Sequence, residues 1–128
     1  MLRRYSALFF RAAALENIGL FDENTFLDFE ELIMAEKVRS AGFSVHFVPQ
    51  SSIWHKQSAS ASGLKAKRYI ENAKSEEYFF SHYVRLSPLE RWVVRLIRFL
   101  TYGARALRYR NYREHFNDFI DALRAPQF

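Results

Sequence analysis

The sequence contains no cysteine, and only 4 glycines and 3 prolines among its 128 residues. The lack of cysteine excludes a disulfide scaffold, a thiolate metal site and a cysteine nucleophile, and it fits a reducing compartment. The low glycine and proline content argues against collagen-like or linker sequence. No window holds the roughly 18 uninterrupted apolar residues that a membrane-spanning helix requires, so we expect no segment that crosses a bilayer.

Apolar and aromatic residues are abundant instead. Hydrophobic residues make up 49% of the chain and aromatic residues 17%, which is too much apolar surface for a disordered tail. A chain of this length is the size of one domain and should bury a core. The net charge of +5 is uneven: residues 1–60 carry six basic and seven acidic side chains (net −1), and residues 61–128 carry thirteen and seven (net +6). The two halves should therefore do different jobs.

Residues 1–60 have the pattern of mixed α and β structure. Short apolar or alternating runs predict strands, and apolar residues at three- and four-residue spacing predict a helix that ends at Gly42 in a left-handed C-cap. The expected strands are 5–10, 43–48 and 52–55, and the expected helices are 11–18 and 28–41.

Residues 61–128 have the pattern of helices throughout. A small, polar stretch over 56–63 predicts the loop that joins the two halves. Pro88 follows Ser87 at a position typical of a first helical turn. The expected helices are 64–83, 88–110 and 111–123.

Four carboxylates lie close together on one predicted helix: Asp28, Glu30, Glu31 and Glu36. One interpretation is structural, because Asp28 and Glu31 have the spacing of a capping box and acids in a first turn suit the helix dipole. The other is catalytic, with a carboxylate used in acid–base chemistry. Spacing leaves both open. His55 is ambiguous as well, because a lone histidine more often has a structural role than a ligand role.

The order of several short motifs is more specific than any one of them. The series is Gly-Leu-Phe-Asp-Glu at 19–23, Phe-Leu-Asp-Phe-Glu-Glu at 26–31, Ala-Gly-Phe at 41–43, Val-Pro at 48–49 and Trp-His at 54–55. This series resembles the C-terminal, acceptor-side half of family 2 inverting glycosyltransferases of the rhamnosyltransferase type. The resemblance implies an α/β fold class: a partial GT-A-like sheet with its helices, followed by an all-helical C-terminal segment.

The resemblance also implies roles for particular residues. Glu31 occupies the place of the general base, and Glu30, Asp28 and Trp54 would bind and orient the acceptor. Inverting transfer is one in-line displacement, so one carboxylate must take the proton of the acceptor hydroxyl. His55 occupies the place of a ligand for the divalent ion, Mn²⁺ or Mg²⁺, that stabilises the leaving diphosphate in such enzymes.

The sequence departs from the family pattern in several places. Ile33 and Lys37 stand where a further acid and an arginine are common, and Asp28 stands where an aromatic residue is common. An Asp-x-Asp motif and a glycine-rich phosphate loop are both absent, and in this family they belong to a separate nucleotide-sugar-binding half. We therefore expect this chain to be inactive alone and, with unpaired strand edges and an uncovered apolar face, to form homo-oligomers.

Residues 85–113 carry eight arginines and a single acid, Glu90. The apolar residues over 89–107 fall on one arc of a helix, and the arginines of that stretch fall opposite. One interpretation is a helix in the headgroup plane of an anionic membrane, which would place the protein in the cytoplasm, peripheral to the inner face of the cell membrane. The other is an apolar arc packed on the first half with a solvated arginine face. Nucleic acid is not an expected partner, because such binders need no wide apolar arc.

Two functions from different classes follow. The first is the acceptor-side portion, over 1–60, of a glycosyltransferase that uses a nucleotide sugar and a glycan or lipid-linked acceptor, with residues 61–128 as a basic helical appendage. The alternative is a non-catalytic basic α/β interaction module that docks on a membrane surface or a protein partner.

Overall fold

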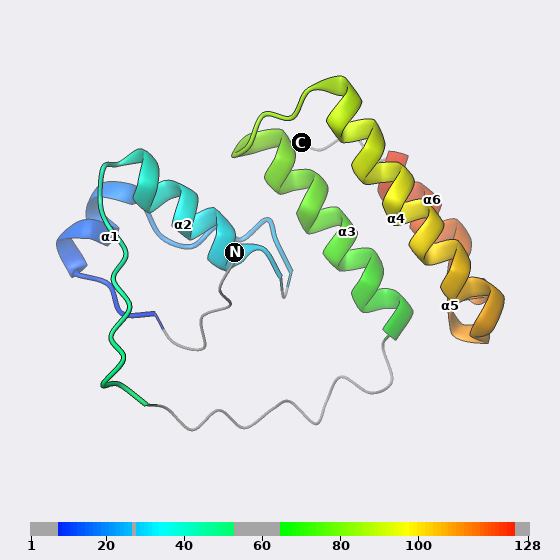
Figure 1. Ribbon diagram of the computed structural model, residues 1–128, viewed down its shortest axis with the longest axis horizontal. Helices are drawn as coiled ribbons and strands as arrows, with labels where there is room; N and C mark the ends of the chain where they lie inside the picture. Colours follow the sequence, from blue (N-terminus) through cyan, green and yellow to red (C-terminus); the bar gives the residue numbers. More distant parts are fainter. Residues whose placement is uncertain (1–7, 27, 53–64, 125–128) are drawn as a thin grey trace.

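The computed structural model describes residues 8–26, 28–52 and 65–124, and within these ranges the chain is all-helical (Figure 1). The helices found there are α1 (Ala12–Ile18), α2 (Glu30–Ser40), α3 (Lys65–His82), α4 (Pro88–Arg108), α5 (Arg110–Glu114) and α6 (Phe116–Arg124). Figure 1 shows α3 between the α1 and α2 part of the chain on one side and α4 and α6 on the other. None of the described helices is long and apolar enough to cross a membrane.

The predicted α/β fold class, with its partial GT-A-like sheet over 1–60, is wrong for the described residues, since these contain no strand. Segment 43–48 was expected to be a strand because apolar and polar residues alternate along it. Its apolar side chains Phe43, Val45 and Phe47 are all exposed. The backbone hydrogen bonds found at its two ends join residues close in sequence, from Phe43 N to Val38 O and from Ser51 N to Val48 O. A strand needs a neighbouring strand to satisfy its backbone, so alternation by itself does not produce a strand.

The other two expected strands are only partly described. Residues 8–10 and 52 are not in strands, and the remainder of 5–10 and of 52–55 lies outside the described residues. The helix predictions were closer to the structure. Four of the five expected helices appear with ends shifted by a few residues, and the fifth, 111–123, is divided at His115 into α5 and α6.

The ends of the helices test three predictions. Gly42 follows Ala41, the C-cap of α2, and has a φ of 76°, which confirms the left-handed conformation predicted at this helix end. Pro88 is in the first turn of α4, where Ser87 and Glu90 form a reciprocal capping box. The capping box predicted for Asp28 and Glu31 is wrong, because α2 begins one residue later, with Phe29 as its N-cap, and no side chain caps it there.

The core of the helical half is aromatic. The rings of Tyr102 and Phe119 are both fully buried and stack with their centroids 4.0 Å apart. The Tyr102 hydroxyl lies 3.0 Å from the carbonyl oxygens of both Tyr112 and His115 and shares its one hydrogen between them, at the chain reversal between α4 and α6. Small residues on α3, among them Ala66 and Ala73, let these rings approach the helix closely. The core is therefore built where α3, α4, α5 and α6 meet.

Helix α4 is turned so that four of its five arginines face α3. Arg95 forms two hydrogen bonds with Glu77, at 2.8 and 2.9 Å, and Arg98 pairs with Glu76 at 2.6 Å. The guanidinium of Arg105 lies over the ring of Tyr69 in α3. The interpretation in which the apolar arc packs inward and the arginine face is solvated is therefore wrong for α4.

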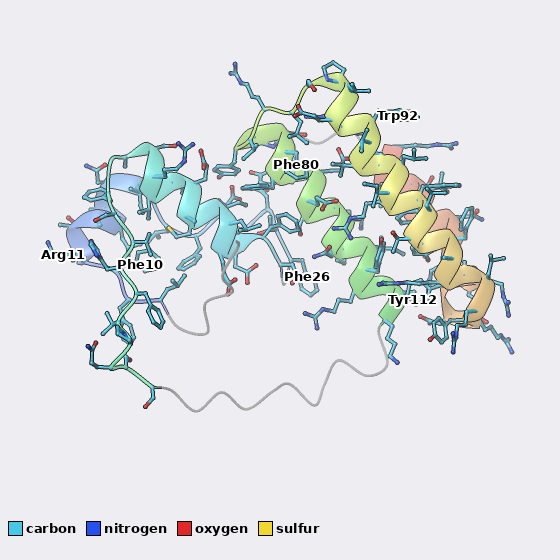
Figure 2. All side chains as sticks on the ribbon, viewed as in Figure 1. Phe10, Arg11, Phe26, Phe80, Trp92 and Tyr112 are labelled. Atoms are coloured by element: carbon cyan, nitrogen blue, oxygen red, sulfur yellow. The ribbon has the colours of Figure 1, made fainter. Side chains whose placement is uncertain are left out.

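The opposite side of α4 is apolar and exposed, and we call it the outer face. Figure 2 shows Trp92 near the N-terminal end of this helix. Exposure within the outer face runs from 37% for Leu96 to 84% for Leu107. Its members are Leu89, Trp92, Val93, Leu96, Ile97, Phe99, Leu100 and Leu107.

Candidate functional site

The loop between α1 and α2 is tied to α3 through one carboxylate. Asp22 Oδ2 accepts hydrogen bonds from the hydroxyls of Tyr83, at 2.5 Å, and Tyr78, at 2.9 Å. Asp22 Oδ1 accepts from the backbone N and the side-chain Nδ2 of Asn24, at 2.9 and 2.8 Å. Both oxygens are thus used, and a residue of the first half is joined to the C-terminal end of α3.

These hydrogen bonds decide the protonation of Asp22. Burial alone would raise the pKa of this carboxyl, but the bonds from Tyr83, Asn24 and Tyr78 outweigh burial and lower the pKa to about 2. Burial, together with the hydrogen bond to Asp22 and its charge, raises the pKa of the Tyr83 phenol above its ordinary value. Asp22 is therefore an anion at neutral pH, held by neutral phenols.

Further contacts place α2 relative to this loop. Lys37 Nζ, on α2, donates to the carbonyl oxygen of Leu20 at 2.7 Å. The backbone N of Phe26, labelled in Figure 2 in the loop before α2, donates to Ser75 Oγ of α3 at 3.3 Å. The ring centroids of Phe29, before α2, and Phe79, in α3, lie 5.7 Å apart. Loop, α2 and α3 are therefore connected at several points.

The first turn of α2 carries Glu30 and Glu31, both partly exposed. A carboxylate there lies beside the free backbone N–H groups and the positive end of the helix dipole. Buried Ile33 and Met34 follow directly and fix the side of the helix that faces inward. The Oε2 atom of Glu30 and the Oγ1 atom of Thr25 are buried and have no hydrogen-bond partner among the described residues.

The structure brings together three of the five predicted site residues. Glu30 and Glu31 share the first turn of α2, and Asp28 precedes it by two residues, with its Oδ1 3.8 Å from Nη2 of Arg68 on α3. Trp54 and His55 lie outside the described residues.

The predicted metal site depends on His55 and so stays a prediction. Within the described ranges, no group of three histidine or acidic side chains could hold a metal ion.

Sequence reasoning missed the residues that frame this site. Asp22 was noted only as part of the Gly-Leu-Phe-Asp-Glu motif, and its partners Tyr78 and Tyr83 are more than fifty residues away in sequence. Their spacing gives no local signal, because residues five apart on a helix lie about 140° apart around its axis. Glu76 and Glu77 were missed too, although an acid pair on one helix and arginines at 91, 95 and 98 on the next indicate a charged contact.

Scans against protein-family models, curated proteins and solved structures returned no match for this chain. A functional assignment therefore depends on the residues and geometry described above.

Proposed function

We propose that this chain supplies the acceptor side of an inverting glycosyltransferase similar to family 2, with Glu31 as the general base. The observation that carries the proposal is the position of Glu30 and Glu31 in the first turn of α2, immediately after a loop that Asp22 and Lys37 hold in place. This is the helix position that the ordered motifs imply for the base. The partial GT-A-like sheet is not part of the proposal.

The proposed reaction needs one proton acceptor from this chain. An oxygen of the acceptor hydroxyl attacks the anomeric carbon of the sugar and forms the new glycosidic bond, while the bond from that carbon to the diphosphate oxygen breaks. The hydroxyl proton passes to the Glu31 carboxylate, and the nucleoside diphosphate leaves with the electron pair. Because attack and departure occur on opposite sides, the configuration of the anomeric carbon inverts.

Two neighbouring acids suit acceptor positioning. Glu30 Oε2 has unused capacity to accept a hydrogen bond, and an acceptor hydroxyl is a donor of the right kind. Asp28, held towards Arg68, would contribute a second acceptor oxygen beside it. Trp54 as an acceptor contact and His55 as a ligand for Mn²⁺ or Mg²⁺ belong to the same proposal, and no step above depends on them.

Substitution of Glu31 by Gln tests the role of the base. The transfer assay pairs this chain with a nucleotide-sugar-binding domain that carries the Asp-x-Asp motif, which this sequence lacks. We expect Glu31→Gln to lower kcat by about a hundredfold or more, since an amide cannot take the proton. Glu36→Gln, on the same helix with its carboxylate on Arg39, is the matched control and should keep kcat within about twofold. Unchanged transfer by Glu31→Gln would remove this residue from the mechanism.

A second candidate is a non-catalytic basic module that docks on another surface. The exposed outer face of α4 favours it, because monomeric soluble proteins rarely expose an apolar patch of this extent. The same transfer assay separates the candidates: a docking module has no activity that Glu31→Gln could remove.

The proposed location is the cytoplasm, at the inner face of the cell membrane. A transferase that acts on a lipid-linked acceptor must reach the membrane surface, and nothing in the described helices spans it.

A further inference from the structure

We propose that the outer face of α4 lies on an anionic lipid surface, with the helix parallel to the membrane plane. This inference stands apart from the glycosyltransferase proposal, because it depends on α4 and not on the acids of α2. The membrane contact is made by the apolar side of α4 and not by its arginines, because three of these arginines form hydrogen bonds with α3.

The shape and chemistry of the outer face suit a lipid boundary. At roughly 100° per residue, its members cover an arc of roughly 160° that includes no charged side chain. Gly103 and Ala104 fall within the same arc and keep it continuous. A helix with such a face and charged residues on the other side lies in the interface with its apolar side towards the acyl chains. Trp92 near one end is a residue type enriched at membrane interfaces.

The contacts between the arginines of α4 and the acids of α3 oppose rotation of α4 about its axis. Glu77 is 3% exposed and pairs with Arg95, and Arg91 lies 3.9 Å from it. Rotation of α4 about its axis would leave this buried carboxylate without a cation, which is strongly unfavourable. Arg98 would lose Glu76 and Asn72 in the same step. The apolar side therefore stays outward until something outside this fold covers it.

Charge selects an anionic bilayer as the occupant. Residues 65–124 carry thirteen basic and seven acidic side chains, a net of +6. Among the described residues, Arg85, Arg108 and Arg113 form no ion pair, and they lie just before α4, at its end and in α5. Cations are therefore present at both ends of the outer face. Each cation near an anionic membrane surface strengthens binding by about fivefold.

The same charges disfavour a second copy of the chain on this face. An antiparallel pair of α4 helices would bring Arg85 of one copy towards Arg108 and Arg113 of the other. A parallel pair would place identical cations together. In both arrangements like charges approach across the contact, whereas phosphatidylglycerol headgroups would neutralise them.

Vesicle binding by the full chain tests the proposal. Vesicles of equal parts phosphatidylglycerol and phosphatidylcholine should bind the chain at least about tenfold more tightly than vesicles of phosphatidylcholine alone, as measured by co-sedimentation. In the Trp54→Phe variant, Trp92 is the remaining tryptophan, and its fluorescence should shift to the blue on binding. Absent binding, or equal binding to both vesicle types, would overturn the proposal.

A matched pair of substitutions locates the contact. Leu100→Glu adds a carboxylate within the outer face and should weaken vesicle binding by about tenfold or more. Thr101→Glu adds the same charge one residue on, outside the face, and should change binding by only a few-fold. Circular dichroism should show unchanged helix content for both variants. Equal losses would contradict the assignment of the face, and a dimer in sedimentation velocity that Leu100→Glu dissociates would assign the face to a second copy instead.

Discussion

Arg95 of α4 and Glu77 of α3 form a two-point ion pair, at 2.8 and 2.9 Å, between two helices of the same half of the chain. We expect Arg95→Ala to lower the free energy of unfolding by about 2 kcal/mol, because it leaves a buried carboxylate with only a distant cation, while partial exposure of Arg95 limits the loss. Urea denaturation measures the change.

The exposed pair of Arg110 and Glu114 is the control for that experiment. Its 2.7 Å contact lies in solvent, so Arg110→Ala should change the free energy of unfolding by at most about 0.5 kcal/mol. Equal effects of the two substitutions would show that the contact between α3 and α4 contributes no more than a surface ion pair.

Asp22 should make stability depend on pH at the acid end. Its folded pKa of about 2 lies below its ordinary value of 3.8, so its contribution is complete above pH 3.8 and is lost as the pH falls towards 2. Tyr83→Phe removes the hydrogen bond from Tyr83 and should flatten the fall in the urea midpoint across this range. If the urea midpoint of Tyr83→Phe falls between pH 3.8 and 2 as steeply as that of the parent chain, Asp22 does not control this loss of stability.

The Tyr102 phenol should make stability depend on pH at the alkaline end. Burial, with the charges of Tyr112 and Asp118, raises its pKa to about 12 from 10.0. The neutral phenol is the form that the fold holds, so its contribution is complete below pH 10 and is lost as the pH rises towards 12. The pKa values of Tyr78 and Tyr83 are also raised, so titration of phenolate absorbance should show several late-ionising tyrosines, one of which is lost in Tyr102→Phe. That variant should also lose about 1 to 2 kcal/mol, because two carbonyl oxygens lose their donor.

Two glycines should respond to alanine in opposite directions. Gly42 has a φ of 76°, so Gly42→Ala should destabilise the chain by about 1 kcal/mol although no atom lies within 4 Å of the added Cβ. Gly103 lies inside α4 with equally open surroundings, so Gly103→Ala should stabilise by about 0.5 to 1 kcal/mol. Thermal unfolding of the two variants checks the signs, and a shared sign would contradict the backbone argument.

Sequence periodicity predicted most helices because that signal is local. The C-cap at Gly42 and the capping box of Ser87 and Glu90 depend on neighbours within a few residues, and both agree with the residue types. The strand expected over 43–48 failed because a strand depends on a distant partner that alternation cannot supply.

The sequence left the orientation of α4 open between a helix in the headgroup plane of a membrane and an apolar arc packed inward. An apolar arc opposite arginines normally places the arc inward, but here Glu76 and Glu77 on α3 provide buried partners for Arg98 and Arg95. The contact with Asp22 could not be found from local patterns either, since Tyr78 of α3 and Tyr83 directly after it are more than fifty residues away in sequence. Glu30 and Glu31 were placed correctly on a helix because the acids and the helix start belong to one short segment.

The apolar side of α4 must face outward if it is to lie on a membrane and if the arginines of α4 are to pack against α3. The chain has no cysteine, so a single introduced thiol reports one position. Thiol labelling of Leu100→Cys should be at least about tenfold faster than that of Ala106→Cys, because Leu100 is 59% exposed and Ala106 is 9% exposed. Slower labelling of Leu100→Cys than of Ala106→Cys would show that the apolar side faces inward and would contradict the account.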